Sequence, residues 1–234
     1  MNTRFARRIS AVCVLASSLL IPASSSFGDD VSPAGAGSKA LLFSMALLTP
    51  SAYNGGLGMK YYIADPFALR GDLQFGFADH KIPGTGGASD EEVSATQFGI
   101  SVGGEYHFMK SRVSPCVSPY AGVDLGVSTT STDSKNSVAA FAEVKNVASG
   151  VTIGGAPYQG GLNFRVGLIG GVEFFVLREL SLGAEYNLGY SLTALSDQQA
   201  TTNGNPSTTV TTKEGNINSF GINGIGTFTL AFYF

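Results

Sequence analysis

Nine side chains able to carry a charge recur on the polar side of short alternating stretches between residues 60 and 185. Carboxylates, cations and an imidazole on one face supply the groups of acid–base catalysis, and equally those of a buried ion-pair network. Catalysis is the better interpretation only if a nucleophile, a metal site or a phosphate-binding motif accompanies these groups. The nine are Lys60, Arg70, Asp72, Glu105, His107, Asp124, Arg165, Glu173 and Glu185.

No catalytic motif accompanies these groups in the sequence. A hydrolytic triad needs a serine, a histidine and a carboxylate that converge. Ser101 precedes His107 by roughly 20 Å at the rise of an extended strand, so it is not that partner. The glycine-rich run at residues 84–87 has no following Lys-Ser or Lys-Thr and opens no helix, unlike a phosphate-binding loop. We therefore expect no enzyme, no cofactor and no metal site.

Two-residue alternation is the main structural signal. In Leu180–Leu192 the even positions are apolar and the odd positions are Ser, Gly, Glu or Asn, and Phe67–Phe77 and Phe98–Phe108 repeat the pattern. Ala40–Leu48 is the least clear case, because it is apolar on both faces. The alternation predicts eight strands: Ala40–Leu48, Tyr53–Ile63, Phe67–Phe77, Ser94–Phe108, Cys116–Ser128, Gly161–Phe175, Leu180–Ser191 and Ile217–Phe234.

Short turns alternate with long polar loops along the chain. The turns are Ala64–Pro66, Met109–Pro115 and Leu177–Glu179, and the loops are 78–93, 129–160 and 192–216. The short connection Thr49–Ala52 departs from this layout. In loop 129–160, Phe141–Val147 and Val151–Gly154 could pair as a hairpin, and Val138, Phe141 and Val144 also have helical spacing. The hairpin leaves ten strands as an alternative to eight, and we favour eight.

Residues 1–28 have the pattern of a secretory signal peptide, with an uncleaved anchor as the alternative. Arg4, Arg7 and Arg8 precede a short apolar stretch, and small residues surround Gly28. Residues 29–39 would be a lead-in and residues 40–234 the folded domain. The signal segment holds three of the 14 basic residues and no acid, so the mature chain carries 11 basic and 17 acidic side chains, a net charge of −6. Nucleic acid is not an expected partner, because binding phosphates needs clustered Lys and Arg.

A membrane-spanning fold for this chain would have to consist of strands. After residue 28 the longest apolar run, Ala40–Leu48, is far shorter than the ~20 residues of a membrane helix. Closed β-barrels are the other structure that leaves no backbone unpaired in lipid. A soluble lipocalin-type barrel would show the same alternation with its apolar face inward. We favour the membrane barrel because the polar face is rich in Gly, Ser and Ala, which suit a narrow eight-stranded interior.

Aromatic residues support the membrane barrel, since they collect near the strand ends as two interfacial girdles. Tyr61, Phe67, Tyr106, Phe108, Tyr120 and Phe174 lie near the short turns, and Tyr53, Phe77 and Tyr190 lie near the loops. The last strand carries alternating apolar residues and ends the sequence on an aromatic: Phe228, Leu230, Phe232 and Phe234.

These terminal residues resemble the closing strand of bacterial outer-membrane β-barrel proteins. The architecture resembles the small eight-stranded group that includes the OmpA membrane domain, OmpX and the opacity-type surface proteins. The resemblance implies an eight-stranded antiparallel transmembrane β-barrel with short periplasmic turns and long extracellular loops. It also implies that the barrel-assembly machinery reads Phe228, Leu230, Phe232 and Phe234. Outer-membrane lipid would be the second partner.

The charged residues are then expected to form an ion-pair network inside the barrel, because an isolated buried charge is costly. Lys60 and Arg70 should be near-opposite, neutralised by Asp72 and Glu105, and Arg165 should pair with Asp124 or Glu185. The expected network is Lys60, Arg70, Asp72, Glu105, Asp124, Arg165, Glu173 and Glu185. Such a network would plug the interior, although a narrow gated conduit is the alternative.

The expected function is that of an outer-membrane surface protein with a structural, adhesin or antigen role. A host or surface ligand would bind through loops 78–93, 129–160 and 192–216, because binding sites concentrate on loops held by a rigid scaffold. A small passive, porin-like channel is the alternative, and a soluble lipocalin-like ligand binder is the third hypothesis.

Overall fold

The computed structural model describes residues 35–49, 52–83, 90–108, 116–136, 141–147, 151–153, 156–202, 204, 206–222 and 226–234. The predicted signal peptide at residues 1–28 and the glycine-rich run at 84–87 lie outside these residues. Among the described residues, no helix is both long and apolar enough to cross a membrane.

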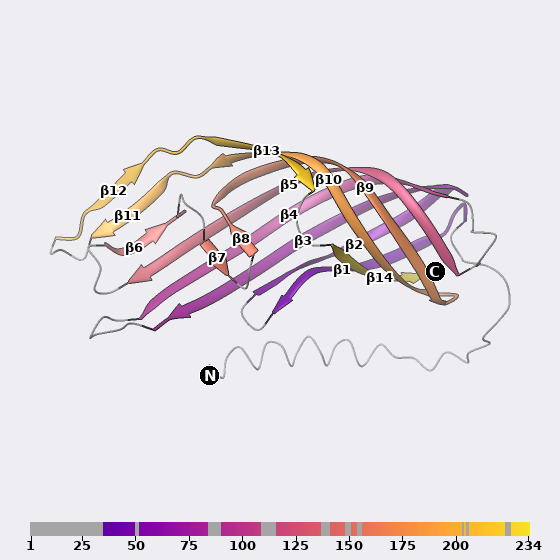
Figure 1. Ribbon diagram of the computed structural model, residues 1–234, viewed down its shortest axis with the longest axis horizontal. Helices are drawn as coiled ribbons and strands as arrows, with labels where there is room; N and C mark the ends of the chain where they lie inside the picture. The colour runs from indigo at the N-terminus through magenta and orange to yellow at the C-terminus, as the bar shows by residue number, and fades with distance from the viewer. Residues whose placement is uncertain are drawn as a thin grey trace. The chain divides into compact units, whose positions relative to one another are not determined.

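Eight strand positions close into an antiparallel ring (Figure 1). The ring strands are β1 (Lys39–Thr49), β2 (Ala52–Ala64), β3 (Phe67–Ile82), β4 (Glu91–His107), β5 (Val117–Asn136), β9 (Gly161–Leu177), β10 (Leu180–Leu195) and β14 (Thr227–Tyr233). Each pairs with the next, and β14 pairs with β1. Beyond β14, Lys39 and Phe234 exchange backbone hydrogen bonds of 3.0 and 3.4 Å. The predicted eight-stranded antiparallel barrel is confirmed.

The eighth position holds two strands in succession. β13 (Asn216–Ile222) pairs with the half of β10 near the long loops, Leu188–Ala194. β14 pairs with the half near the short turns, Leu180–Glu185. The predicted strand Ile217–Phe234 is therefore two strands, and residues 223–225 between them are not described.

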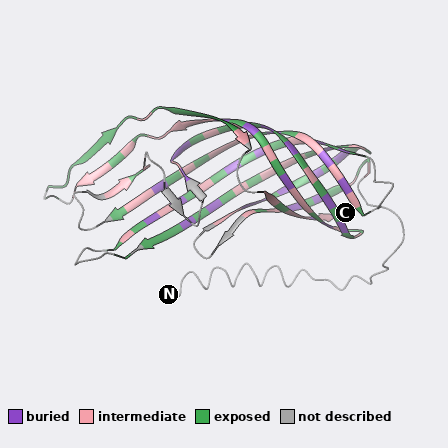
Figure 2. Ribbon diagram, viewed as in Figure 1, coloured by how far each residue is buried: buried purple, intermediate pink, exposed green. Residues whose placement is uncertain are grey.

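The inward and outward faces alternate as the membrane barrel requires (Figure 2). The outward side chains are large and apolar, and Leu69, Val102 and Leu168 are each more than half exposed. The inward positions hold charged, hydroxyl and small residues, including buried Lys60 and Glu105. This is the reverse of a soluble lipocalin-type barrel, whose apolar face points inward. The apolar outer face is the surface that lipid covers.

An apolar and aromatic cluster fills the lumen at the short-turn end. Its buried members are Ala40, Leu42, Tyr62, Ala68, Phe175, Ala231 and Tyr233. This cluster explains why the first predicted strand is apolar on both faces: β1 presents Ala40 and Leu42 to the cluster, and Leu41 and Met45 outward.

A small sheet extends the barrel wall at the opposite, long-loop end. β5 continues past its pairing with β9 and pairs with β6 (Phe141–Lys145); β6 pairs with β11 (Gln198–Thr202), and β11 pairs with β12 (Thr209–Thr212). We call β6, β11, β12 and residues Asp133–Lys135 of β5 the outer sheet. Loops 129–160 and 192–216 thus contain strands rather than only irregular chain.

The alternative hairpin between Phe141–Val147 and Val151–Gly154 does not form, and Phe141 and Val144 lie in a strand rather than a helix. Val138 lies outside the described residues. β6 pairs with β5 and β11 instead, and β7 (Val151–Ile153) pairs with β8 (Ala156–Tyr158). β5 and β11 together pair with both edges of β6, whereas the three-residue β7 could pair with only one of them. The preference for eight ring strands over ten is nevertheless correct.

One outward apolar residue gives a direct test of the membrane face. Leu168, in the middle of β9, is 59% exposed. We expect Leu168→Arg to lower the free energy of unfolding from lipid vesicles by about 2–4 kcal/mol, because a charge at the bilayer midplane loses its hydration. The matched control is Thr211→Arg in β12, outside the ring, which should change stability by less than ~0.5 kcal/mol. Equal effects of the two substitutions, measured by urea titration, would contradict the assigned lipid face.

Candidate functional site in the barrel lumen

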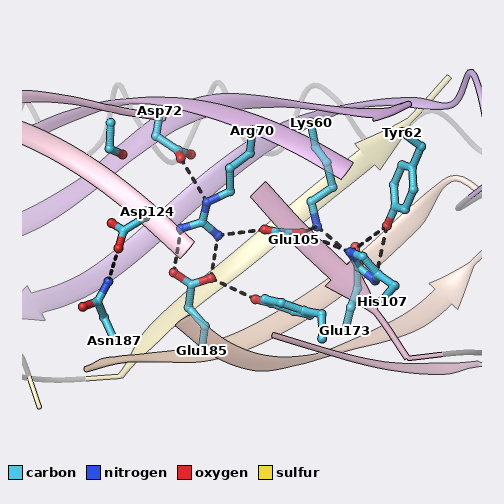
Figure 3. Close-up of polar contacts among 12 residues, drawn as sticks. Lys60, Tyr62, Arg70, Asp72, Glu105, His107, Asp124, Glu173, Glu185 and Asn187 are labelled. Carbon is cyan, nitrogen blue, oxygen red and sulfur yellow. Dashed lines mark hydrogen bonds and ion pairs between the residues drawn. The ribbon is translucent and has the colours of Figure 1, made fainter. Parts of the chain in front are cut away.

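Glu105 lies at the centre of the charged groups in the lumen and is 2% exposed. Its carboxylate lies 2.8 Å from Lys60 Nζ and 3.0 Å from Arg70 Nη1. His107 Nε2 lies 3.0 Å from the carboxylate oxygen that Lys60 contacts. Figure 3 shows these side chains converging from β2, β3 and β4. Lys60 and Arg70 are register partners on β2 and β3, so one carboxylate separates two cations that would otherwise repel each other.

Glu185 holds the guanidinium of Arg70 from the opposite wall of the barrel. Arg70 donates two hydrogen bonds to it, of 2.6 and 2.9 Å, in the bidentate geometry that strengthens such pairs. The Tyr120 hydroxyl donates a third, of 2.9 Å. Asp72 lies 3.4 Å from Arg70 Nε. Arg70 therefore links β3 to β4 and to β10 across the lumen (Figure 3).

Glu173 receives mainly hydroxyl donors. Ser181 and Tyr233 donate hydrogen bonds of 2.5 and 2.6 Å to one of its oxygens, and Lys60 Nζ lies 3.5 Å from the other. In the lumen three cations, Lys60, Arg70 and Arg165, face five carboxylates, Asp72, Glu105, Asp124, Glu173 and Glu185. The carboxylates therefore share cations, and hydroxyl and amide groups supply further hydrogen bonds to Glu173, Glu185 and Asp124.

Asp124 and Arg165 form a separate pair nearer the loop end. Arg165 donates a 2.6 Å hydrogen bond to Asp124, which is 1% exposed, and Asn187 donates a second of 2.6 Å to the other oxygen. Of the two partners expected for Arg165, the structure pairs it with Asp124, because Glu185 is occupied by Arg70.

A serine, a histidine and a carboxylate do lie in a row. His107 Nδ1 is 2.9 Å from Ser118 Oγ, and Nε2 is 3.0 Å from Glu105. All three residues are buried, and neither cavity described below is lined by Ser118 or His107. These groups hydrogen-bond to one another and to Tyr62, and we assign the row to the internal hydrogen-bond network. Among the described residues, no group of three or more His, Cys, Asp or Glu side chains could hold a metal ion.

A polar cavity of about 630 Å³ occupies the loop half of the lumen. We call it the vestibule. Its floor includes Arg70, Asp72 and Glu185, and its walls include Asn54, Asn163 and Thr193. Below the floor, beside Lys60, Tyr120 and Glu173, the side chains leave a void of about 10 Å³, room for at most one water. The vestibule is thus blind at the turn end.

Sequence reasoning missed several hydroxyl groups of the network. Tyr120, expected in the aromatic girdle, is 5% exposed and points inward, and Tyr62 and Tyr233 also face the lumen. Tyr120 had to point inward because it lies an even number of residues from Asp124, which the alternation already places inside. That parity is the signal that could have identified it.

The four residues expected to be read during assembly share one outward face of the closing strand. Phe228 and Phe234 are exposed, and Phe232 packs edge-on against Phe43 of β1 with ring centres 5.8 Å apart. Leu230 is a register partner of Phe43. These positions agree with contact to lipid, while recognition by the assembly machinery stays a prediction.

Comparisons with known proteins give one family. The model of the "Outer membrane protein beta-barrel domain" matches residues 10–223. None of the curated proteins matches the chain. Similar solved structures include OprG from Pseudomonas aeruginosa, at 13% identity and a TM-score of 0.43, covering 88% of this chain and 99% of OprG. A major outer membrane protein from Thermus thermophilus has 12% identity and a TM-score of 0.43, covering 84% and 99%. Neisserial surface protein A has 16% identity and a TM-score of 0.38, covering 84% and 95%.

Removing the central carboxylate tests the energetic role of the network. We expect Glu105→Gln to lower the free energy of unfolding by about 3–5 kcal/mol, because Lys60 and Arg70 lose their shared counter-charge in a buried site. The measurement is urea unfolding of the detergent-folded barrel. Asp90→Asn is the matched control: it removes the 2.7 Å pair with exposed Lys81 and should leave the free energy of unfolding nearly unchanged, because water screens this pair. Similar losses in the two variants would mean that Glu173 and Glu185 alone balance the two cations.

Proposed function

This chain belongs to the family of outer membrane protein β-barrel domains, and from that membership we propose that it acts at the cell surface through its outer sheet. The protein lies in the bacterial outer membrane. In the proposed orientation its short turns face the periplasm and its long connections face outside, as this layout implies. The proposed role is that of an adhesin, or of a structural or antigenic surface protein. Its partner would be a host or surface ligand that contacts the outer sheet.

The single observation that carries the proposal is the outer sheet itself. Two of the long connections, 129–160 and 192–216, meet there as paired strands instead of remaining separate loops. β5 belongs to both the barrel wall and the outer sheet, so the sheet has a rigid mounting on the barrel. A binding surface held by a rigid scaffold loses little conformational entropy when a partner binds.

The chemistry of the outer sheet suits contact with another macromolecule. All four residues of β12 are exposed, and three of them are threonines. Thr201 and Thr209 are joined by a 3.1 Å hydrogen bond across the β11–β12 pair. Within the described residues, β12 has β11 on one side and no strand on the other. An unpaired edge of this kind offers backbone donors and acceptors to an extended partner segment.

The closed lumen favours this proposal over a passive channel. A conducting path would have to pass Glu105, Arg70 and Glu185, where the side chains are in direct contact and leave a void of about 10 Å³. Opening it requires separating buried ion pairs, each of which costs several kcal/mol to break.

Adherence tests the outer sheet directly. A non-adherent bacterium displaying the full chain should bind epithelial monolayers or aggregate with itself, and replacing residues 198–212 with a short Gly-Ser linker should return it to the level of cells without the protein. The reason is that this change removes β11 and β12 but leaves the ring strands intact. Gln74→Ala, inside the lumen, is the control and should adhere as the unaltered chain does. Heat-modifiable gel mobility verifies that each variant is folded. Undiminished adherence of the linker variant would contradict the proposal.

Planar-bilayer recording tests the closed lumen. The unaltered chain should give no stepwise conductance, because the Arg70–Glu185 and Arg70–Glu105 pairs block the path. Discrete openings whose size shifts in Arg70→Ala or Glu105→Gln would establish a channel through the network instead.

A further inference from the structure

The vestibule has the size of a small-molecule site. Its volume of about 630 Å³ lies within the range of roughly 300–1,000 Å³ that is typical of such sites. It is blind at the turn end, so whatever occupies it enters from outside the cell. It lies inside the ring and is separate from the outer sheet, so its occupant need not be the partner proposed above.

Amide and hydroxyl side chains make up most of the lining of the vestibule. Asn54 donates a 3.3 Å hydrogen bond to Gln97, and Asn163 donates one of 2.8 Å to Thr193. These bonds hold the amide groups in place before any ligand arrives. Ser128, Thr130, Ser191, Thr227 and Thr229 add hydroxyl groups to the same walls. Both kinds of group can donate and accept hydrogen bonds.

The charged groups that line the vestibule are already paired. Arg70 contacts Asp72 and Glu185, and Arg165 contacts Asp124 directly behind it. An incoming anion would meet the lumen's excess of carboxylates. An incoming cation would lose its hydration to reach carboxylates that the arginines already engage. The site thus favours a neutral ligand.

We propose that the vestibule binds a neutral polyhydroxyl molecule of the size of a mono- or disaccharide. Asn54, Asn163 and Thr193 supply its hydrogen bonds from the vestibule wall. The same chemistry is offered by a free sugar and by the terminal sugar of a longer glycan.

The test is a titration of the folded, full-length barrel in lauryldimethylamine oxide, a detergent without a sugar headgroup. Glucose, galactose, sucrose, lactose and trehalose are added, and binding is followed by saturation-transfer NMR and calorimetry. We expect at least one to bind with a dissociation constant of about 1 mM or tighter. Gluconate and glucosamine, of similar size but charged, should bind at least about tenfold more weakly.

Two lumen variants assign the binding to the vestibule. Asn163→Leu should weaken it about tenfold, as expected for the loss of a hydrogen-bonding group, and Thr130→Trp should abolish it by filling the cavity. Thr211→Leu, in β12, is the matched control and should bind as the unaltered chain does. Heat-modifiable mobility must show that every variant is folded.

The outcomes are distinct. No binding by any of the five sugars, or equal binding by folded Thr130→Trp, overturns the proposal, and so does tighter binding of the charged analogues. A second titration distinguishes a free sugar from the terminal sugar of a glycan. It uses the best-binding sugar coupled through its reducing end to a soluble polymer. Binding of the free sugar alone identifies a small solute, and binding of both forms identifies a glycan terminus.

Discussion

The backbone pairing between β1 and β14 is the constraint on which the rest of the structure depends. In hydrocarbon, an unpaired N–H or C=O has no water to bind, so a sheet must close on itself. The register Ala40↔Tyr233 to Met45↔Phe228 closes it. Once the ring is closed at eight strands, the interior is narrow and every alternate side chain has to fit inside it.

The filling of the lumen follows from that narrowness. Large inward groups are accommodated where neighbours are small: a Cβ on Gly171 would come within 2.5 Å of the Tyr120 ring. The turn half is filled by the apolar cluster and by the network around Glu105, whereas shorter Ser, Thr and Asn side chains leave the vestibule open. The different lengths of inward side chains thus divide the lumen into a closed half and an open half.

The sequence was sufficient for the ring and for the ions that meet inside it, because both follow from two-residue parity. The opposition of Lys60 and Arg70 follows from the short turn between β2 and β3. The sequence was not sufficient for the outer sheet, since β6 and β11 are far apart in the chain and each has only five residues, too few to reveal a partner. The inward tyrosines were missed for another reason. An aromatic residue near a strand end is expected at the membrane interface, but Tyr120 lies an even number of residues from Asp124, and this alternation directs its side chain into the lumen.

The distribution of Glu173's partners has a consequence for the order in which strands can enter the bilayer. Lys60 comes from β2, Ser181 from β10 and Tyr233 from β14, while Glu173 itself is on β9. A partly inserted chain lacking β14 would hold this carboxylate in a low-dielectric interior with fewer donors, a strongly unfavourable state. Stepwise insertion of single hairpins is therefore disfavoured, and a concerted entry, with both ends of the strand series already joined, is the route that keeps the charge satisfied throughout.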